Sequence, residues 1–550
     1  MDIDRILLIK TYPISGEHMK FISMIKSNWL SGLVTIFLAS FLIVTHLRLN
    51  QYAFDDAFIH FRVARNLIEN GHPFYNINEM VKVSTSSGWT VFLAILFGIA
   101  RLFKIDNNYP MIVGITNAAI SLCGMLVYTK VVEILLSRRL SLIEKILFQI
   151  PNLALLLPSS IGLMETPFAL LVAGLGILLL VKSKPSGFAL LGFAAYIRLE
   201  LLVLVGLAVV LLLLQKQFRP WKIALYLALG VGPFLAYDLY FFHTIIPNAI
   251  VAKSIVFSIP GWVSAFYILV HSLPALPFHQ ALVSFCVGMA FLVIVLVTAF
   301  SVLVIGRPRR LTDTWPALFC LWSLFIMGGY ILTHALEFPW YLPLYTIPLL
   351  VACFTGSLSD QAKRNMIFKS MIPVVFLVSV LSLASTYWGS TMNPDAFSWF
   401  GTNARVKVYL KTGAILNEEY PGARLLTSEI GGLGYTFKGE ILDAAGLASP
   451  EALKYQPLTI PDQRATGDIG GIPPGYVREN MPEIIVTYDV FAKALLSDDV
   501  VRQYNVILIP ALLPEDAIYS ESKTIWGSKY LYVYIRKDLP ISKKISALGK

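Results

Sequence analysis

Repeated apolar runs of about twenty residues constrain this chain more than any other feature, because a helix of that length crosses the roughly 30 Å hydrocarbon core of a bilayer. Of the 550 residues, 56% are hydrophobic and 14% are charged, whereas a soluble protein carries roughly 25% charge. The sequence therefore predicts a polytopic α-helical membrane protein with about 11 transmembrane helices. The expected spans are residues 30–48, 88–104, 111–136, 146–161, 162–181, 187–214, 222–242, 280–304, 316–333, 340–356 and 370–388.

Positive charge gathers in short loops. The formal net charge is +10, and its clearest clusters lie at Lys216–Lys222, Arg307–Arg310 and Lys363–Lys369. Short loops rich in Lys and Arg stay on the cytoplasmic side of a membrane. We interpret the clusters as topology signals facing anionic membrane lipids, and they give no support to nucleic-acid binding.

The same rule orients the chain. It predicts a cytoplasmic N-terminus over 1–29 and an extracytoplasmic polar tail after the last span. The middle of the chain leaves two alternatives, because eleven single crossings would place the basic stretches 137–145 and 181–184 outside. Either 88–104 or 187–214 breaks into re-entrant or paired short helices. We expect a multi-pass protein of the inner (plasma) membrane.

Three regions follow from this topology: the cytoplasmic N-terminus 1–29, a transmembrane domain over 30–390 whose first external loop is 49–87, and a C-terminal extracytoplasmic domain over 393–550. In the last region, short β-branched runs predict strands: ARLLTSEI, EIIVTYDV, NVILIP and KYLYVYIRK. Intervening helices are expected at Pro450–Tyr455 and Val490–Asn505. We predict a small α/β domain.

An acidic pair in the first external loop points to chemistry. Asp55 and Asp56 are followed closely by His60, Arg62 and Arg65. Carboxylates near hydrocarbon are costly and therefore mark functional sites by default. A partly desolvated carboxylate can act as a general base, and guanidinium groups suit phosphate. The alternative is that one aspartate only caps the following helix. The loop predicts chemistry on a lipid-linked phosphate.

The run DDAFIHFRVARNLIENGHPFYN, continued to Trp89, resembles the first external loop of GT-C membrane glycosyltransferases, and most closely that of the arabinofuranosyltransferase-like branch. Five later segments resemble family segments in the same order: GLMETPFALL, AAYIRLELLVL, IIPNAIVAKS, FPWYLPLYTIP and EIGGLGYTFKGEILDAAGL. The resemblance covers about residues 30–490. The chain departs from it at Arg198–Glu200, where the family more often has Arg-Pro-Glu, and at Val83–Trp89, where the family usually has an acidic or glycine-bearing turn.

The resemblance implies a GT-C-like fold and transfer of a sugar from a polyprenyl-phosphate donor to an extracytoplasmic cell-envelope glycan or glycolipid acceptor. It also implies that Asp55 or Asp56 is the general base or helps to hold a divalent cation, Mg or Mn. The expected substrate-binding residues are His60, Arg62, Arg65, Trp89, Glu165, Asn248, Lys253, His334, Glu337, Trp340 and Tyr341.

Several of these residues could instead have a purely structural role. Glu165 could cap a helix, Arg198 and Glu200 could form a structural ion pair, and Trp340 and Tyr341 could belong to an interfacial aromatic belt. Two other functions also stay open: a transporter or flippase of a lipid-linked saccharide, and a membrane scaffold that binds wall polymer. A transporter often shows inverted repeats, and a scaffold has no need of acids and arginines in the first loop.

Overall fold

The computed structural model describes residues 16–49, 52–105, 108–271, 314–358, 372–384 without 374 and 382, 398–458, 471–517, and 524–548 without 526. The predicted span 280–304 lies outside the described residues, and 370–388 lies partly outside them.

Helices make up the first two thirds of the described chain. They are α1 (Gly16–Leu49), α2 (Asp55–Asn70), α3 (Ser87–Leu102), α4 (Tyr109–Leu135), α5 (Leu142–Ile161), α6 (Thr166–Val181), α7 (Gly187–Ile197), α8 (Leu202–Leu214), α9 (Pro220–Phe242), α10 (Asn248–Val256), α11 (Gly261–His271), α13 (Trp315–Leu332) and α14 (Pro343–Leu358). By length and composition, Gly32–Leu49 of α1 and the helices α4, α5, α9 and α13 could each cross a membrane, and shorter apolar helices pack among them. The helical membrane class is confirmed, whereas the count of about 11 spans is not.

Contacts between helix ends fix the direction of α6, α7 and α8. Glu165, just before α6, lies 2.5 Å from Arg198, just after α7. Gln217, after α8, donates a hydrogen bond to Ser183, after α6, at 2.9 Å. Helices α6 and α7 are therefore antiparallel, and α8 runs back from Arg198. We call the end of the bundle that bears Glu165 and Arg198 the domain-facing end, and the opposite end the distal end.

The apolar run 187–214 is broken at Arg198. This residue has extended dihedrals (φ −143°, ψ 115°), and a short 3₁₀ turn at Leu199–Leu201 separates it from α8. The run therefore forms two short helices, which is one of the two alternatives that the charge pattern left open. The break places Arg198 and Glu200 at the domain-facing end.

Helix α3 also stays at the domain-facing end. Phe97, in its second half, stacks on Tyr109 at the start of α4 with ring centroids 4.0 Å apart, and it contacts Phe61 of α2. Trp89, near its beginning, packs on Phe168 at the start of α6. Both halves of α3 thus contact segments of the same end, as the re-entrant alternative for 88–104 requires.

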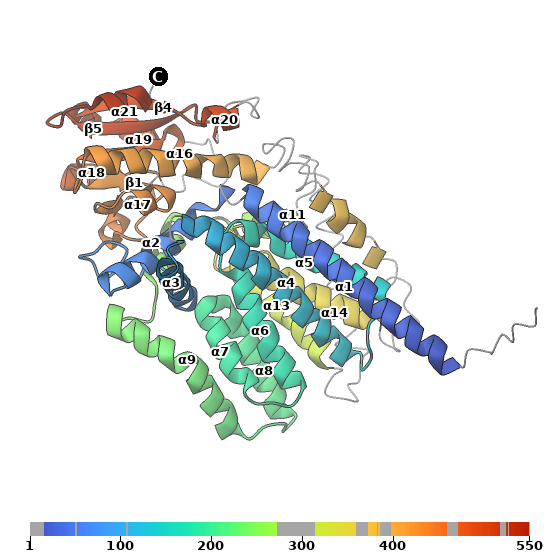
Figure 1. Cartoon of the computed structure of the whole chain (residues 1–550). Coiled ribbons are helices and arrows are strands. Elements are labelled where there is room, and N and C mark those ends of the chain that lie inside the picture. Colours follow the sequence, from blue (N-terminus) through green and yellow to red (C-terminus); the bar gives the residue numbers. More distant parts are fainter. Residues whose placement is uncertain are drawn as a thin grey trace, which may run out of the picture.

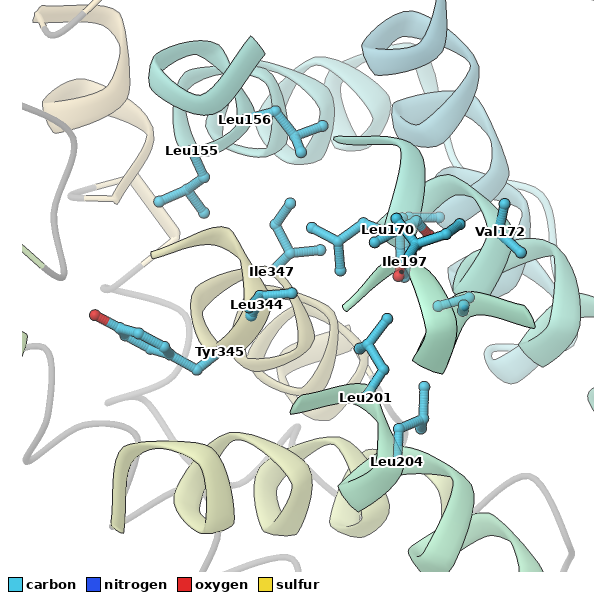
Figure 2. Close-up of a cluster of buried hydrophobic side chains, with 14 of the residues drawn as sticks. Leu155, Leu156, Leu170, Val172, Ile197, Leu201, Leu204, Leu344, Tyr345 and Ile347 are labelled. Atoms are coloured by element: carbon cyan, nitrogen blue, oxygen red, sulfur yellow. Dashed lines mark hydrogen bonds between the residues drawn. The ribbon is translucent and has the colours of Figure 1, made fainter. Parts of the chain in front are cut away.

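A large cluster of buried side chains in the interior of the bundle is apolar. In Figure 2, Leu155 and Leu156 of α5, Leu170 of α6, Ile197 of α7 and Leu344 of α14 converge on one cluster of buried side chains. Helices in a membrane associate largely through such van der Waals packing. Polar side chains gathered at the domain-facing end therefore stand out against this core.

The C-terminal domain is a five-stranded sheet flanked by helices. Its elements are α16 (Ser398–Glu419), β1 (Leu425–Thr427), α17 (Gly432–Thr436), β2 (Ile441–Asp443), α18 (Pro474–Asn480), β3 (Ile484–Tyr488), α19 (Asp489–Leu496), β4 (Tyr504–Pro510), α20 (Pro514–Ala517), β5 (Tyr530–Arg536) and α21 (Lys543–Leu548), with 3₁₀ turns at Pro450–Tyr455 and Asp499–Gln503. The strand order is β2-β1-β3-β5-β4, with β1 parallel to β2 and β3, and with β5 antiparallel to β3 and β4. Figure 1 shows the domain at one end of the helical bundle, beside α2 and α3.

The predicted sheet domain is confirmed, with differences in detail. All four predicted strand runs contain strands, but β2 is only three residues long and was not predicted. The expected helix Val490–Asn505 is instead α19, a 3₁₀ turn and the start of β4. The expected helix Pro450–Tyr455 is a 3₁₀ helix. Strand β2 was missed because three residues, of which only Ile441 and Leu442 are apolar, are too few to show a period.

Candidate functional site

Helix α2 presents two faces, because successive residues are rotated by about 100° around an α-helix. It begins at Asp55, and Phe54 occupies the N-cap position without a side-chain cap hydrogen bond. The alternative in which Asp55 or Asp56 caps this helix is therefore wrong. The two carboxylates leave the helix in different directions and reach different partners.

Asp55 faces the C-terminal domain. Its Oδ2 and Oδ1 atoms accept hydrogen bonds from the backbone N–H groups of Gly431 and Gly432, each at 2.8 Å. Burial, with a further contribution from the nearby Glu429, raises the pKa of the Asp55 carboxyl to about 7. Both carboxylate oxygens are therefore occupied by main-chain donors, and the side chain is buried.

The two arginines of α2 also bind the C-terminal domain. The Arg62 guanidinium is buried, and all its hydrogen bonds go to backbone carbonyls. The acceptors are the carbonyl oxygens of Tyr75 (2.8 Å), Gly434, Phe437 (2.7 Å) and Gly439 (2.9 Å). Arg65 donates to the carbonyl of Tyr435 at 3.0 Å and lies over its ring. The structure does not bring these predicted phosphate ligands to Asp56.

Asp56 faces the helical bundle. Its Oδ2 atom lies 3.3 Å from the Nζ atom of Lys253 in α10, and the Lys253 amine lies 3.5 Å from the hydroxyl of Tyr341. Burial lowers the pKa of Lys253, but Tyr341 and Asp56 outweigh it and leave the pKa raised. The side chains of Asp56 and Lys253 are 29% and 24% exposed, so this pair is accessible from outside the protein.

Arg198 lies beside Tyr341, on the side of α2 that Asp56 faces. Its guanidinium lies 2.5 Å from Glu165, binds Glu200 through two nitrogen atoms, and stacks over the Tyr341 ring at 4.4 Å from the centroid. The Tyr330 hydroxyl donates to Glu200 at 3.1 Å. The break in the apolar run at Arg198 makes these contacts possible, because neither Arg198 nor Glu200 belongs to an α-helix.

His60 connects Asp56's face of α2 to Glu165. Its Nε2 atom lies 3.7 Å from Glu165, and its Nδ1 atom lies 3.0 Å from the Ser84 hydroxyl. Burial lowers the pKa of His60, so the imidazole is neutral at pH 7. We call the connected set the site network. It consists of Asp56, His60, Glu165, Arg198, Glu200, Lys253, Tyr330 and Tyr341.

Several residues predicted to bind substrate make most of their contacts outside the site network. Trp89 and Trp340 are buried, and their rings pack among phenylalanines. Trp340 also packs edge-on against Tyr341 of the network, with ring centroids 5.7 Å apart. His334 contacts the backbone carbonyl of Ile259 at 3.1 Å.

Asn248 and Glu337 also make internal contacts. Asn248 donates to the carbonyls of Gly446 and Leu447 in the C-terminal domain, at 2.7 and 2.8 Å. Glu337 is buried and accepts a hydrogen bond from the Tyr345 hydroxyl. Burial raises the pKa of Glu337 to about 8, so its carboxyl is largely protonated at pH 7. The contacts of Asn248 stabilise the domain interface.

Both carboxylates of the acidic pair have protein partners in this structure. Asp55 accepts from the N–H groups of Gly431 and Gly432, and Asp56 pairs with Lys253. The divalent cation therefore stays a prediction. Among the described residues, no group of three His, Cys, Asp or Glu side chains could hold a metal ion.

One buried ion pair was missed from the sequence. Lys82 lies 2.5 Å from Asp238 in α9, and Asp238 also accepts a hydrogen bond from the Ser87 hydroxyl at 2.6 Å. An acid inside the apolar run GPFLAYDLYFF was the available signal, because such residues seldom lack a partner. The pair ties α9 to the segment between α2 and α3.

Comparison with solved structures identifies the class of fold. The chain matches the crystal structure of ArnT from Cupriavidus metallidurans bound to undecaprenyl phosphate, with a TM-score of 0.52 and 12% identity over 93% of this chain and 100% of that chain. The apo structure of the same protein also matches, with a TM-score of 0.52 and 12% identity over 95% of this chain and 99% of that chain.

The chain therefore has an ArnT-like fold, and the predicted GT-C architecture is confirmed at the level of the fold. Residues 398–534 match the model of a domain of unknown function (DUF8728), which spans most of the C-terminal domain. A search of curated protein sequences found no significant match.

Proposed function

We propose that this protein is a membrane glycosyltransferase that transfers a sugar from a polyprenyl-phosphate donor to an extracytoplasmic cell-envelope glycan or glycolipid. The fold supports the proposal, because it matches ArnT over nearly the whole chain, and that ArnT structure holds undecaprenyl phosphate. The observation that carries it for this chain is the contact of Asp56 with Lys253 at 3.3 Å, on the accessible side of the site network.

Asp56 is the proposed general base. In the reaction, the acceptor hydroxyl oxygen forms a bond to the anomeric carbon, the bond between that carbon and the phosphate oxygen breaks, and the hydroxyl proton passes to the Asp56 carboxylate. A nearby carboxylate also stabilises the positive charge that develops on the sugar in such transfers. Asp55 is not available for this step, because its oxygens accept from Gly431 and Gly432.

Lys253 is the proposed partner of the leaving phosphate. The Lys253 amine carries three donors, and it is partly exposed. When the phosphate of the donor binds Lys253, it competes with Asp56 for that amine, which frees the carboxylate to accept a proton. Arg198 is held by Glu165 and Glu200, so its role is to order Tyr341 beside Lys253.

The catalytic assignment can be tested with membranes that carry the intact chain and variants. The assay supplies a panel of undecaprenyl-phosphate sugars with envelope glycan and glycolipid acceptors, and measures release of undecaprenyl phosphate. Asp56→Asn should lower turnover about 10²–10⁴-fold, the usual contribution of a general base. The matched control is Asp538→Asn, an exposed acid of the C-terminal domain. Wild-type turnover by the Asp56 variant would exclude the base assignment.

Donor binding gives a readout that needs no acceptor. Native mass spectrometry of the detergent-solubilised protein should show weaker retention of undecaprenyl phosphate after Lys253→Met. Loss of one charge-assisted hydrogen bond worth about 1.5–3 kcal/mol corresponds to a roughly 10–100-fold higher Kd. Equal retention by Lys253→Met and wild type would remove Lys253 from the phosphate site. Movement of lipid-linked saccharide across vesicles without transfer would instead support the flippase alternative.

A further inference from the structure

The two faces of α2 serve different parts of the molecule. Asp55, Arg62 and Arg65 contact the segment 429–439 of the C-terminal domain, whereas Asp56 and His60 contact the site network. At about 100° per residue, Asp55 and Arg62 project within about 20° of one another, and Asp56 and His60 within about 40°. One short helix therefore connects the domain to the network.

The contact between α2 and the segment 429–439 is close and specific. A β-carbon added at Gly431 would overlap the backbone carbonyl of Asp55, and one added at Gly434 would overlap the Tyr75 hydroxyl. The Tyr75 hydroxyl donates to the Ile430 carbonyl at 2.5 Å. Because the obstruction at Gly431 is backbone, only glycine fits there, and the chain of the domain approaches the start of α2 directly.

The partners of Asp55 are themselves held in place. Glu429 binds Arg405 of α16 through two carboxylate oxygens, at 2.6–3.0 Å, and also accepts from the Tyr409 hydroxyl at 3.0 Å. These contacts fix the segment that presents the N–H groups of Gly431 and Gly432. Asp55 is thereby anchored to the folded core of the C-terminal domain.

From this arrangement we infer that the segment 429–439 positions Asp56. It grips Asp55 and Arg62 and so sets the rotation and height of α2, which decides where the neighbouring carboxylate meets Lys253. In this view Asp55 is a positioning residue that acts through Asp56, and the C-terminal domain is required for the geometry of the site network. The catalytic consequence of the inference rests on the proposed function.

The first experiment needs no substrate, because it reads the Asp56–Lys253 contact directly. The detergent-solubilised full chain is treated briefly with N-hydroxysuccinimidyl acetate, and acetylation of Lys253 is followed by mass spectrometry relative to Lys454, an exposed lysine of the C-terminal domain. Loss of the Asp56 contact should lower the pKa of Lys253. A fall of one unit raises the reactive amine fraction about tenfold.

Asp56→Asn defines the reactivity of Lys253 without its partner. Asp55→Asn, which keeps the shape and one acceptor atom, and Gly431→Ala, which perturbs the same contact from the opposite side, should both raise Lys253 acetylation toward that level. The control is Gly98→Ala in α3, where an added β-carbon meets open space. Wild-type Lys253 reactivity in both test variants, with a clear rise in Asp56→Asn, would overturn the inference. So would an unchanged Lys253 in Asp56→Asn itself.

The second experiment tests the catalytic consequence. With Asp56 present, Asp55→Asn should lower kcat about 10–100-fold, the cost of a misplaced catalytic group, and leave KM for the donor nearly unchanged. With Asp56→Asn as background, adding Asp55→Asn should have little further effect, because residues that act as a unit are not additive. If the losses of kcat from Asp55→Asn and Asp56→Asn instead multiply in the double variant, Asp55 does not act through Asp56. A Lys253 response without any transferase activity would preserve the positioning role and count against the proposed function.

Discussion

Replacing Arg62 with methionine should release the C-terminal domain from α2. Methionine is close to arginine in length but donates no hydrogen bond, so the four carbonyl oxygens that Arg62 binds, three of which belong to the C-terminal domain, lose a charged donor. A hydrogen bond to a charged group contributes about 1.5–3 kcal/mol. Two effects reduce this loss: some carbonyls regain water or relax, and the variant no longer has the desolvation cost of a buried guanidinium. We therefore expect the docked state to lose about 4–6 kcal/mol.

This loss is measurable by amide hydrogen exchange in the detergent-solubilised chain. The N–H groups of Gly431 and Gly432 are protected by Asp55, so peptides covering them report undocking. A change of about 5.5 kcal/mol shifts an equilibrium by roughly 10⁴, so exchange should accelerate by at least about a thousandfold unless another opening limits it.

The matched control for Arg62→Met is Arg478→Met. Arg478 is 55% exposed and pairs with Asp498, and an exposed pair contributes about 0–1 kcal/mol. If the two variants accelerate exchange at Gly431 and Gly432 equally, the cost of burying the Arg62 charge cancels its hydrogen bonds. The view of Arg62 as a strong interdomain contact would then be refuted.

Two other perturbations test the described contacts. Lys82→Met should destabilise the folded chain by about 3–5 kcal/mol, because it leaves the Asp238 carboxylate buried without its cation. Lys82→Met combined with Asp238→Leu should recover much of the lost thermal stability. A double variant as unstable as Lys82→Met would contradict this. Burial raises the pKa of Asp443 to about 6 from 3.8. The folded state therefore holds this proton to higher pH, and the free energy of unfolding should fall by about 2 kcal/mol as pH rises from about 4 to about 6, and by about 3 kcal/mol over the whole titration. In a pH series of unfolding, Asp443→Asn should remove that slope, and an unchanged slope would show that other groups cause it.

The sequence predicted the class of fold and several members of the site network, because apolar length, charged loops and an acidic pair are local signals. Asp56, His60, Glu165, Lys253 and Tyr341 were expected, and the structure brings them together. The roles of other residues could not be read in this way. Arg62 carries donors that suit a phosphate and a set of backbone carbonyls equally well, and only the long-range contact with residues 434–439 distinguishes the two.

Tyr330 illustrates a different limit. It lies inside the apolar helix α13, where a tyrosine fits ordinary packing, and its contact with Glu200 depends on the break in the helix at Arg198. A one-residue step along α2 also decides which aspartate meets Lys253. Patterns of residue type place both acids in one loop, but their separate partners follow from the three-dimensional arrangement of distant segments.

The charge rule and the helix directions agree only when two changes to the eleven single crossings are combined. In the first change α3 does not cross the membrane, and in the second the run 187–214 turns back at Arg198. If α3 does not cross the membrane but the run 187–214 crosses once, the basic stretches 137–145 and 181–184 move to the cytoplasmic side, but 216–222 moves outside. If 187–214 alone reverses direction, 216–222 lies on the same side as 181–184, so all three stretches lie outside. The structure supplies both changes, since α3 remains at the domain-facing end and the chain reverses at Arg198. All three basic stretches then share the distal end, which the rule assigns to the cytoplasm. The same rule predicts that the site network and the C-terminal domain lie on the extracytoplasmic side, as the proposed function requires.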